Sequence, residues 1–513
     1  MELNAATLLS VALASLAILV SLLRRKTASS SEKRRPPGPR CLPFIGSLLH
    51  LLTSKAPVVL RDLARKHGPV MYLRLGQVDH IVISSSAMAQ EVLRDNTLNF
   101  ASRPSILAGE IVCYGNLDIA FAPYGAYWRT LRKLCTMELL SARKVRQFAP
   151  IRDSETLSLV REVAAASERG MPVNLPSVLL SCSNSITAKA AFGEVCSPEL
   201  RQQFLSAMEV AVSLGLGFCV GDLFPSLWFV DVVSGMRRRL WRTHRQMDAV
   251  FDTIIAECES RRLKRKTAGM TEDDDILSVI LRIKDEGEIE FPVGNTNVKA
   301  IVFDLFIGGT ETTSTAVEWI MSELMRNPEV MKKAQAEVRR AFDNTKPQDH
   351  EEHIEELPYM RMIVKEALRM HPPLPLLIPH LCRDTCEIGG FKVLAGSRVL
   401  VNAWAIGRSP DYWHDAEQFR PERFEESKLD YKGTHYEYLP FGSGRRMCPG
   451  SNFGLAALEL ILARFLYYFD WSLPAGTRPE ELDMDMVVGA TSKRRNPLNL
   501  IATPYNVSMK YQS

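Results

Sequence analysis

The stretch FGSGRRMCPG at Phe441–Gly450 places one cysteine, Cys448, among three glycines, two arginines and a proline. The glycines permit tight turns and close approach of the backbone. An apolar segment with a helical pattern, Phe453–Phe469, follows, so Cys448 is expected just before a helix N-terminus, where free amide groups favour a negative sulfur. Arg446 can meet an anion through two hydrogen bonds. The stretch therefore predicts a loop that offers a thiolate to a metal and a guanidinium to an anion.

Length and composition set few limits on this chain of 513 residues, which could form one large domain or two to three smaller ones. Hydrophobic residues make up 46% and charged residues 24%, as in ordinary globular proteins. The formal net charge of +4 is too small to predict nucleic-acid binding.

The ten cysteines are scattered and include no CxxC pair. This pattern predicts a reducing, cytosol-facing compartment rather than a disulfide framework. Most of the cysteines are expected to be small buried hydrophobic residues, and Cys448 is the exception because of its neighbours.

The N-terminus predicts a retained membrane anchor. Ala5–Leu23 is almost wholly apolar, close to the roughly 20 residues that cross a bilayer, and a basic cluster follows it. A cleaved secretory signal is the alternative, but in such a signal the positive charges precede the apolar segment. PPGP at 36–39 cannot continue a helix. The expected organisation is an anchor at 1–23, a basic and proline-rich hinge at 24–46 and one domain at 47–513.

Helical periodicity dominates after residue 85 and predicts a mainly α protein with small β-sheets. Strands are expected at Pro69–Leu75, Asp79–Ser84, within Cys386–Val401 and near Leu498–Met509. Helices are expected at Ala87–Leu93, Trp128–Glu138, Ala142–Ala165, Val178–Phe192, Glu199–Leu214, Gly235–Lys264, Asp275–Asp285, Val298–Arg326, Val330–Phe342, Met360–Met370 and Phe453–Phe469.

The expected helix Val298–Arg326 contains GGTETT at 308–313, although glycine costs about 1 kcal/mol in a helix interior. Small residues would let a large flat group lie against the backbone. Glu311 and Thr312 supply an adjacent carboxylate and hydroxyl that could pass protons. A tolerated packing notch is the alternative.

Two further groups of residues are informative only in combination. Glu366 and Arg369 lie three apart in KEALR, and PERF supplies Arg423, so the three could form a buried clamp or ordinary surface pairs. Trp128 and Arg132 lie one helical turn apart and could hold ligand carboxylates, or they could belong to a basic surface face with one buried tryptophan.

Taken together, these stretches resemble the cytochrome P450 family of heme-thiolate monooxygenases over nearly the whole chain. The hinge and PERF are similar to microsomal plant members. The resemblance implies the P450 fold, with heme between a long central helix and the cysteine loop, in a catalytic domain at 47–513 behind one transmembrane helix.

The resemblance also implies residue roles. Cys448 would be the axial ligand of heme b iron, with Phe441 packed beside the thiolate. Glu311 and Thr312 would deliver protons. Heme propionates would be held by Trp128, Arg132, His380 and Arg446, and the structural triad behind the heme would be Glu366, Arg369 and Arg423.

The same resemblance implies O2 as cosubstrate and NADPH-derived electrons. An NADPH–cytochrome P450 reductase would supply them, with cytochrome b5 as a further candidate donor. The basic residues expected to meet its acidic surface are Lys133, Arg143, Lys144 and Arg445. The expected location is the endoplasmic reticulum membrane, single-pass, with the catalytic domain in the cytosol.

Segments that line the pocket in this family are largely apolar here, which favours a lipophilic substrate. CYGNLDIAFAPYGAYWR, FDLFIGGTETT and LPLLIPHLCRDTCEIGGF are similar to grass enzymes that oxidise diterpenes in phytoalexin pathways. The expected lining residues are Ile106, Leu107, Phe218, Phe303, Ile307, Leu376, Leu377, Ile378, Val487 and Val488.

Other functions stay open from sequence alone. The substrate could be a sesquiterpenoid, a phenylpropanoid or flavonoid, or a fatty acid. A heme-thiolate isomerase or dehydratase would need no reductase, and intact Glu311 and Thr312 argue against it. A non-catalytic heme-binding sensor or carrier would use the apolar pocket only as a ligand site.

Overall fold

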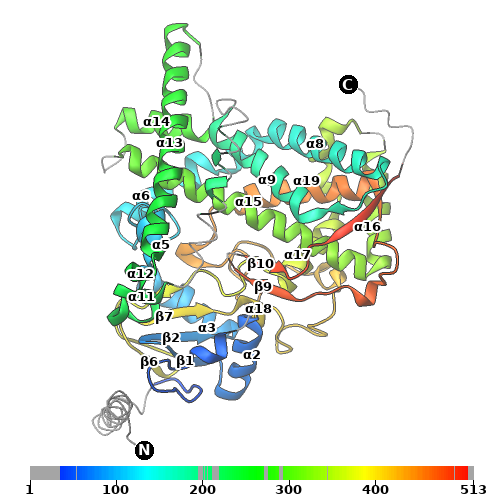
Figure 1. The fold of residues 1–513 in the computed structure, drawn as a ribbon. Helices are drawn as coiled ribbons and strands as arrows, with labels where there is room; N and C mark the ends of the chain where they lie inside the picture. The colour runs from blue at the N-terminus through cyan, green and yellow to red at the C-terminus, as the bar shows by residue number, and fades with distance from the viewer. Residues whose placement is uncertain are drawn as a thin grey trace, which may run out of the picture.

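The computed structural model describes residues 35–52, 55–193, 219–270, 275–287, 293–343, 345–489 and 491–505, together with positions 200, 203–204, 206–208 and 210. This part of the chain is mainly helical, with its largest sheet at one end of the molecule (Figure 1). The helices are α2(Ala56–His67), α3(Ser86–Gln90), α4(Thr97–Phe100), α5(Leu107–Val112), α6(Ala126–Leu134), α7(Ala142–Gln147), α8(Ala149–Glu168), α9(Leu175–Phe192), α11(Val220–Leu223), α12(Phe229–Val233), α13(Met236–Thr267), α14(Ile276–Glu286), α15(Asn295–Arg326), α16(Pro328–Phe342), α17(Pro358–Met370), α18(Ala403–Ile406) and α19(Ser451–Tyr468).

The largest sheet has the order β1-β2-β7-β4. β1(Val70–Leu75) and β2(Val78–Ile83) form an antiparallel hairpin, as the alternating apolar pattern predicted. β7(Arg398–Val401) runs parallel to β2, and β4(His380–Leu381) closes the edge antiparallel to β7. The remaining strands are β3(Val173–Asn174), β5(Cys386–Ile388), β6(Phe391–Val393), β8(Phe469–Ser472), β9(Met486–Val488), β10(Ser492–Arg494) and β11(Asn499–Pro504).

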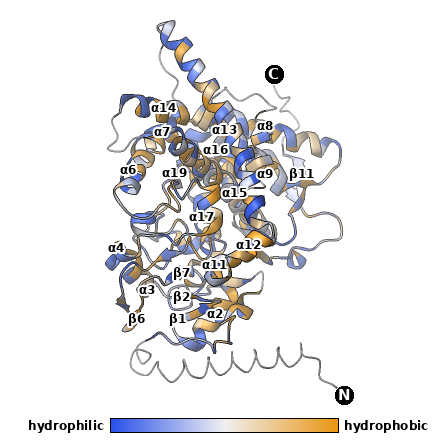
Figure 2. Ribbon diagram, turned by 60° about the vertical axis from the view of Figure 1, so that its left-hand side comes forward, coloured by the Kyte–Doolittle hydropathy of each residue, from blue (hydrophilic) through white to orange (hydrophobic). Residues whose placement is uncertain are grey.

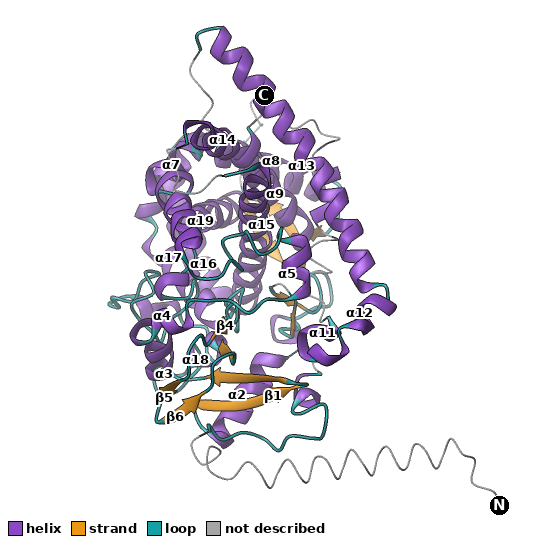
Figure 3. Cartoon of the chain, turned by 90° about the vertical axis from the view of Figure 1, so that its left-hand side faces the viewer, coloured by secondary structure: helices purple, strands orange, loops and turns teal. Residues whose placement is uncertain are grey.

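The long helix α15 runs through the middle of the helical part and packs against α9 and α19 (Figures 1 and 3). Its apolar residues belong to the main hydrophobic core, which also includes residues of α8, α9, α17 and α19. Toward the C-terminal end of α15, Trp319 stacks on His371, with the ring centroids 4.2 Å apart. The indole N–H of Trp319 also donates to the Ser492 carbonyl at 2.6 Å. α15 is thus tied to both α17 and the β9–β10 hairpin.

Several expected elements differ from the structure. The segment predicted as one helix at 142–165 is two helices, α7 and α8, because Pro150 stands in the first turn of α8, where a proline fits best. The Gly396 turn leads into β7, which pairs with β2 rather than extending the β5–β6 hairpin.

Two expectations fall largely or wholly outside the described residues. These are the anchor at 1–23 and most of the helix expected at 199–214. In the described part of the chain, no helix is both long and apolar enough to span a bilayer.

Candidate active site

The Cys448 loop connects the short 3₁₀ helix η8(Gly444–Arg446) to α19. The Cys448 amide donates to the Phe441 carbonyl at 3.0 Å, which closes the loop. Gly444 has φ of 67°, and a Cβ atom there would lie 2.2 Å from the Leu93 carbonyl oxygen. Because that neighbour is backbone, a side chain at 444 would push the loop away. The tight glycine turn predicted from the sequence is therefore confirmed.

The Cys448 thiol is partly buried just ahead of α19. Burial raises its pKa, while a hydrogen bond from the Gly450 amide and the charge of Arg132 act in the opposite direction. These two groups offset part of the effect of burial, and the net direction of the Cys448 pKa is upward. Phe441 lies in the same loop and meets the Tyr431 ring edge to face at 5.7 Å.

Arg446 and Trp128 lie together and donate to backbone carbonyl groups. Arg446 donates through Nε to Ala101 O at 2.6 Å and through Nη1 to Ile119 O at 3.1 Å. Trp128 Nε1 donates to the same Ile119 carbonyl at 3.0 Å, and the guanidinium lies 4.2 Å from the indole centroid. Burial lowers the pKa of Arg446 to about 10.

His380 joins this cluster from β4. Its Nδ1–H donates to the Phe100 carbonyl at 2.7 Å. Burial, and then the charge of Arg103, hold the pKa of His380 well below its ordinary value, so the imidazole is neutral. With the hydrogen on Nδ1, the Nε2 atom of the neutral ring is an acceptor. To donate to a ligand oxygen, His380 would have to adopt the other neutral tautomer, with the hydrogen on Nε2.

Arg103 is a site residue that sequence reasoning missed. It is buried and donates to Ala120 O at 3.1 Å and to Ile378 O at 2.6 Å. Burial and the nearby Arg446 lower its pKa to about 9. The available signal was an arginine inside the apolar stretch expected to line the pocket, followed at once by a proline.

Two buried carboxyl groups, also missed, face these arginines. Asp304 on α15 accepts from the Ala120 amide at 2.8 Å, and burial raises its pKa to about 6. Asp118 is fully buried, and burial followed by the charge of Asp304 raises its pKa. The Asp304 bond ties the loop before α6 to α15.

The glycines in the centre of α15 have different surroundings. A Cβ atom on Gly309 would lie 2.9 Å from Thr187 Oγ1 of α9, so Gly309 allows close helix packing. A Cβ atom on Gly308 would meet nothing within 4 Å. Leu305, Gly308 and Thr312 are accessible and lie on one face of a helix that is otherwise largely buried. That a flat group lies against this open face stays a prediction.

Glu311 and Thr312 point in different directions, since adjacent helical residues are about 100° apart. Thr312 Oγ1 donates to the Gly308 carbonyl at 2.6 Å on the open face. Glu311 is buried and forms an ion pair with Lys493 of β10 at 2.5 Å.

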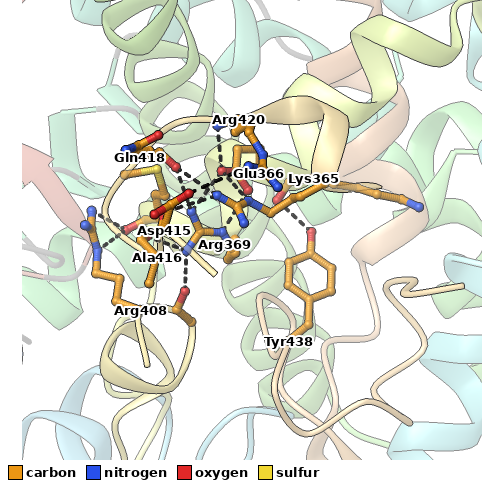
Figure 4. A network of polar contacts seen from close by, with 12 residues as sticks. Lys365, Glu366, Arg369, Arg408, Asp415, Ala416, Gln418, Arg420 and Tyr438 are labelled. Atoms are coloured by element: carbon orange, nitrogen blue, oxygen red, sulfur yellow. Dashed lines mark hydrogen bonds and ion pairs between the residues drawn. The ribbon is translucent and has the colours of Figure 1, made fainter. Parts of the chain in front are cut away.

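The residues of the predicted clamp contact one another, with the Glu366 and Arg369 side chains fully buried (Figure 4) and that of Arg423 5% exposed. Arg369 holds both oxygens of Glu366, at 2.7 and 2.8 Å, and Arg423 Nε adds a third bond at 2.8 Å. Arg369 also donates to the carbonyl groups of Gly407 and Ala416 at 2.5 and 2.8 Å. The clamp therefore fastens α17 to the chain between α18 and η7(Pro421–Phe424).

The residues expected to line a substrate pocket do not all meet in one cluster. Leu107, Phe303 and Ile307 belong to the main core, whereas Leu376, Leu377 and Val488 pack into three separate smaller clusters. Ile106 and Ile378 are half-buried, and Val487 is exposed. Phe218 lies outside the described residues. The proposed lining therefore stays a prediction.

The site as a whole fits a flat, metal-containing group with carboxylate substituents. The thiol of Cys448 would be its metal ligand, and the open face of α15 leaves room for its plane. Burial lowers the pKa of Arg103, Arg132 and Arg446, so an anionic group bound beside them would stabilise their positive charges.

We expect Glu366→Gln to lower the thermal unfolding midpoint strongly, because it leaves two buried guanidiniums without their counter-charge. Breaking a buried pair in this way costs about 3–5 kcal/mol. Glu329→Gln is the matched control, since Glu329 and Lys332 have the same spacing but are largely exposed, at 2.9 Å. Thermal denaturation of the purified variants measures both effects. Equal midpoints for the two variants would contradict a structural role for the clamp.

Comparisons with known proteins agree with this geometry. The family model described as Cytochrome P450 matches residues 36–498. The chain is 60% identical to Cytochrome P450 99A2 of Oryza sativa subsp. japonica, covering 99% of this chain and 94% of that protein. It is also 60% identical to the 9-beta-pimara-7,15-diene oxidase of the same organism, covering 99% and 100%.

A solved zebrafish cytochrome P450 structure with progesterone has the same fold. It aligns with a TM-score of 0.73 at 25% identity and covers 87% of this chain and 99% of that one. The fold, the cysteine loop and the relatives lead to one conclusion: this chain belongs to the cytochrome P450 family and is a heme-thiolate monooxygenase that uses O2 and NADPH-derived electrons.

Proposed function

We propose that this enzyme oxidises a diterpene olefin in specialised metabolism of the phytoalexin type. The observation that carries the proposal is the 60% identity, over the full length of both chains, to an enzyme named for 9-beta-pimara-7,15-diene. The few charged side chains in the expected pocket segments are in keeping with a hydrocarbon substrate.

Each site residue has a proposed role. Cys448 would ligate the heme iron through its sulfur, with Phe441 in the same loop. Trp128, Arg132, His380 and Arg446 would hold the propionates, and we add buried Arg103, which lies beside this cluster, as a further candidate. When bound, heme supplies oxygen activation, and the protein positions the substrate and moves protons.

The chain's own contribution is visible at α15. The Thr312 hydroxyl donates a hydrogen bond to the Gly308 carbonyl. Its oxygen can therefore accept a hydrogen bond on the open face. Glu311, one residue earlier, is the proposed source of protons for that face. The buried clamp of Glu366, Arg369 and Arg423 fixes the chain behind the site without taking part in the chemistry.

We expect Cys448→Ser to abolish monooxygenase turnover, because a hydroxyl does not replace a thiolate as the electron-donating ligand. Cys41→Ser is the control, since Cys41 is exposed and far along the chain from the loop, and it should keep full activity. NADPH-dependent product formation, measured by mass spectrometry, compares the two. Full activity of the Cys448 variant would refute the assignment.

The compounds named for more distant relatives differ in class. Proteins 45–46% identical are named for premnaspirodiene, desmethyl-deoxy-podophyllotoxin and 5-epiaristolochene. The chemistry of substrates therefore varies at that level of identity. The sesquiterpenoid, phenylpropanoid and fatty-acid alternatives are for this reason included in the test below.

We propose that the protein lies on the endoplasmic reticulum membrane, anchored by residues 1–23 with the catalytic domain in the cytosol. An exposed apolar surface supports this. Figure 2 shows apolar colour on α12 and α2 at the end of the molecule that also holds β1 and β2. Its large exposed members are Leu42, Phe44, Leu49, Leu52, Leu227, Trp228, Phe229, Val232 and Val233.

Backbone contacts bring the two segments that carry these apolar residues to the same turn. The turn between β1 and β2 donates from Gly76 to the Ile45 carbonyl at 3.2 Å and from Gln77 to the Leu223 carbonyl at 2.8 Å. The N-terminal segment and the α11–α12 region are thereby held on either side of one turn. Contiguous apolar patches mark protein or membrane contacts.

A second proposed surface receives an NADPH–cytochrome P450 reductase, or cytochrome b5. Lys133, Arg143 and Arg445 are exposed near the cysteine loop and suit an acidic partner. Lys144 is among the residues expected on this surface from the sequence. It is buried, with its ammonium 5.7 Å from the centroid of the Phe148 ring, so it does not belong to the proposed reductase surface.

We expect microsomes containing this enzyme and a reductase to convert a pimaradiene-type diterpene to oxygenated products. Parallel incubations with a sesquiterpene olefin, a phenolic and a fatty acid compare the other classes. Turnover of only those compounds would contradict the diterpene proposal. The activity should sediment with the membrane fraction, and activity wholly in the soluble fraction would contradict the proposed location.

A further inference from the structure

The buried carboxylate of Glu311 does not face the open side of α15 but the C-terminal hairpin. Its Oε1 atom lies 2.5 Å from Lys493 Nζ and 3.4 Å from Thr491 Oγ1. Thr491 in turn lies 3.2 Å from Thr315 Oγ1 of α15. The Lys493 side chain is 51% exposed, whereas that of Glu311 is 12% exposed. Lys493 therefore reaches from solvent to a carboxylate inside the protein.

The hairpin that carries Lys493 is fixed to α15 on either side of this ion pair. Before it, the Ser492 carbonyl accepts from Trp319 Nε1 at 2.6 Å, and the Ser492 amide donates to Pro373 O at 2.9 Å. After it, Arg494 lies 3.8 Å from Glu318, with both side chains buried. Because its neighbours are anchored, Lys493 has a defined position at Glu311.

A buried carboxylate is costly unless a counter-charge or hydrogen bonds stabilise it. Lys493 and Thr491 supply these to Glu311 from one side only, that of the hairpin. The overall reaction, RH + O2 + 2 e⁻ + 2 H⁺ giving ROH + H2O, consumes protons that must come from solvent.

We propose that Lys493 is a positioning residue for Glu311. It holds the ionised carboxylate at the half-exposed edge beside β10, where solvent protons reach it, and Glu311 then carries each proton toward Thr312. The proton leaves water at this edge and ends on oxygen at the open face of α15. This inference rests on the proposed proton-delivery role of Glu311 and Thr312.

We expect Lys493→Met to divert electrons from product to hydrogen peroxide. Product formed per NADPH should fall about threefold or more, a small part of the ~100-fold that a positioned proton donor typically contributes. The kinetic solvent isotope effect on product formation should rise, while substrate KM stays unchanged. Lys493→Arg should restore at least half of the lost product yield, because it keeps the positive charge.

Arg495→Met is the matched control. Arg495 lies two residues further along, is similarly exposed, and pairs with Asp485 at 2.8 Å instead of with α15. Its product yield should equal that of the unmodified enzyme. Infrared difference spectra between each protein and its Glu311→Gln derivative give a readout independent of turnover: the Glu311 carboxylate band should shift in Lys493→Met and not in Arg495→Met.

The double variant separates the two proposals. If Glu311→Gln alone keeps full product yield, the proposed role of Glu311 is wrong. If Glu311→Gln lowers the yield and Lys493→Met adds no further loss in that background, Lys493 acts through Glu311 as inferred. A normal yield for Lys493→Met in the unmodified background, or a further loss in the Glu311→Gln background, would overturn the inference about Lys493.

Discussion

Buried or half-buried guanidinium groups that donate to backbone carbonyl groups hold the irregular parts of this protein in place. Arg446 joins the cysteine loop to the segment around Ile119, and Arg103 joins that same segment to the chain before β4. Arg369 does the equivalent for the chain after α18. Loops cannot satisfy their own carbonyl groups as helices do, so buried loops need such donors. The geometry of the site depends on these three arginines.

The same arrangement explains how a helical protein keeps a site open at its centre. α15 is buried along most of its length, yet Gly308 and Thr312 remain accessible on one of its faces. The tight glycine turn at Gly444, rather than a bulky side chain, sets how close that loop comes to Leu93. A few small residues therefore determine how closely the loop packs and which part of α15 stays accessible.

Local spacing in the sequence predicted the parts of the site that lie within one element. The glycine turns around Cys448, the open face at Gly308 and the pairing of Glu366 with Arg369 follow from helical and turn geometry. Contacts between distant segments could not be predicted in this way. The ion pair of Glu311 with Lys493 joins residues far apart in the chain, and Arg103 finds its carbonyl partners only in the folded protein.

Apolar composition was also a poor guide to the pocket, because core and lining residues have the same character. Leu376 and Leu377 are adjacent in sequence but pack into different clusters. The break between α7 and α8, in contrast, had a visible signal in Pro150 that the helical pattern outweighed.

The central claim is that Cys448 ligates a heme iron as a thiolate. The reduced carbon monoxide difference spectrum of the purified protein tests it most directly, because the position of the Soret band reports the ligand opposite carbon monoxide. The account predicts a band at the position characteristic of thiolate ligation. A band at the position of a histidine-ligated or thiol-ligated heme, in freshly prepared protein, would contradict it.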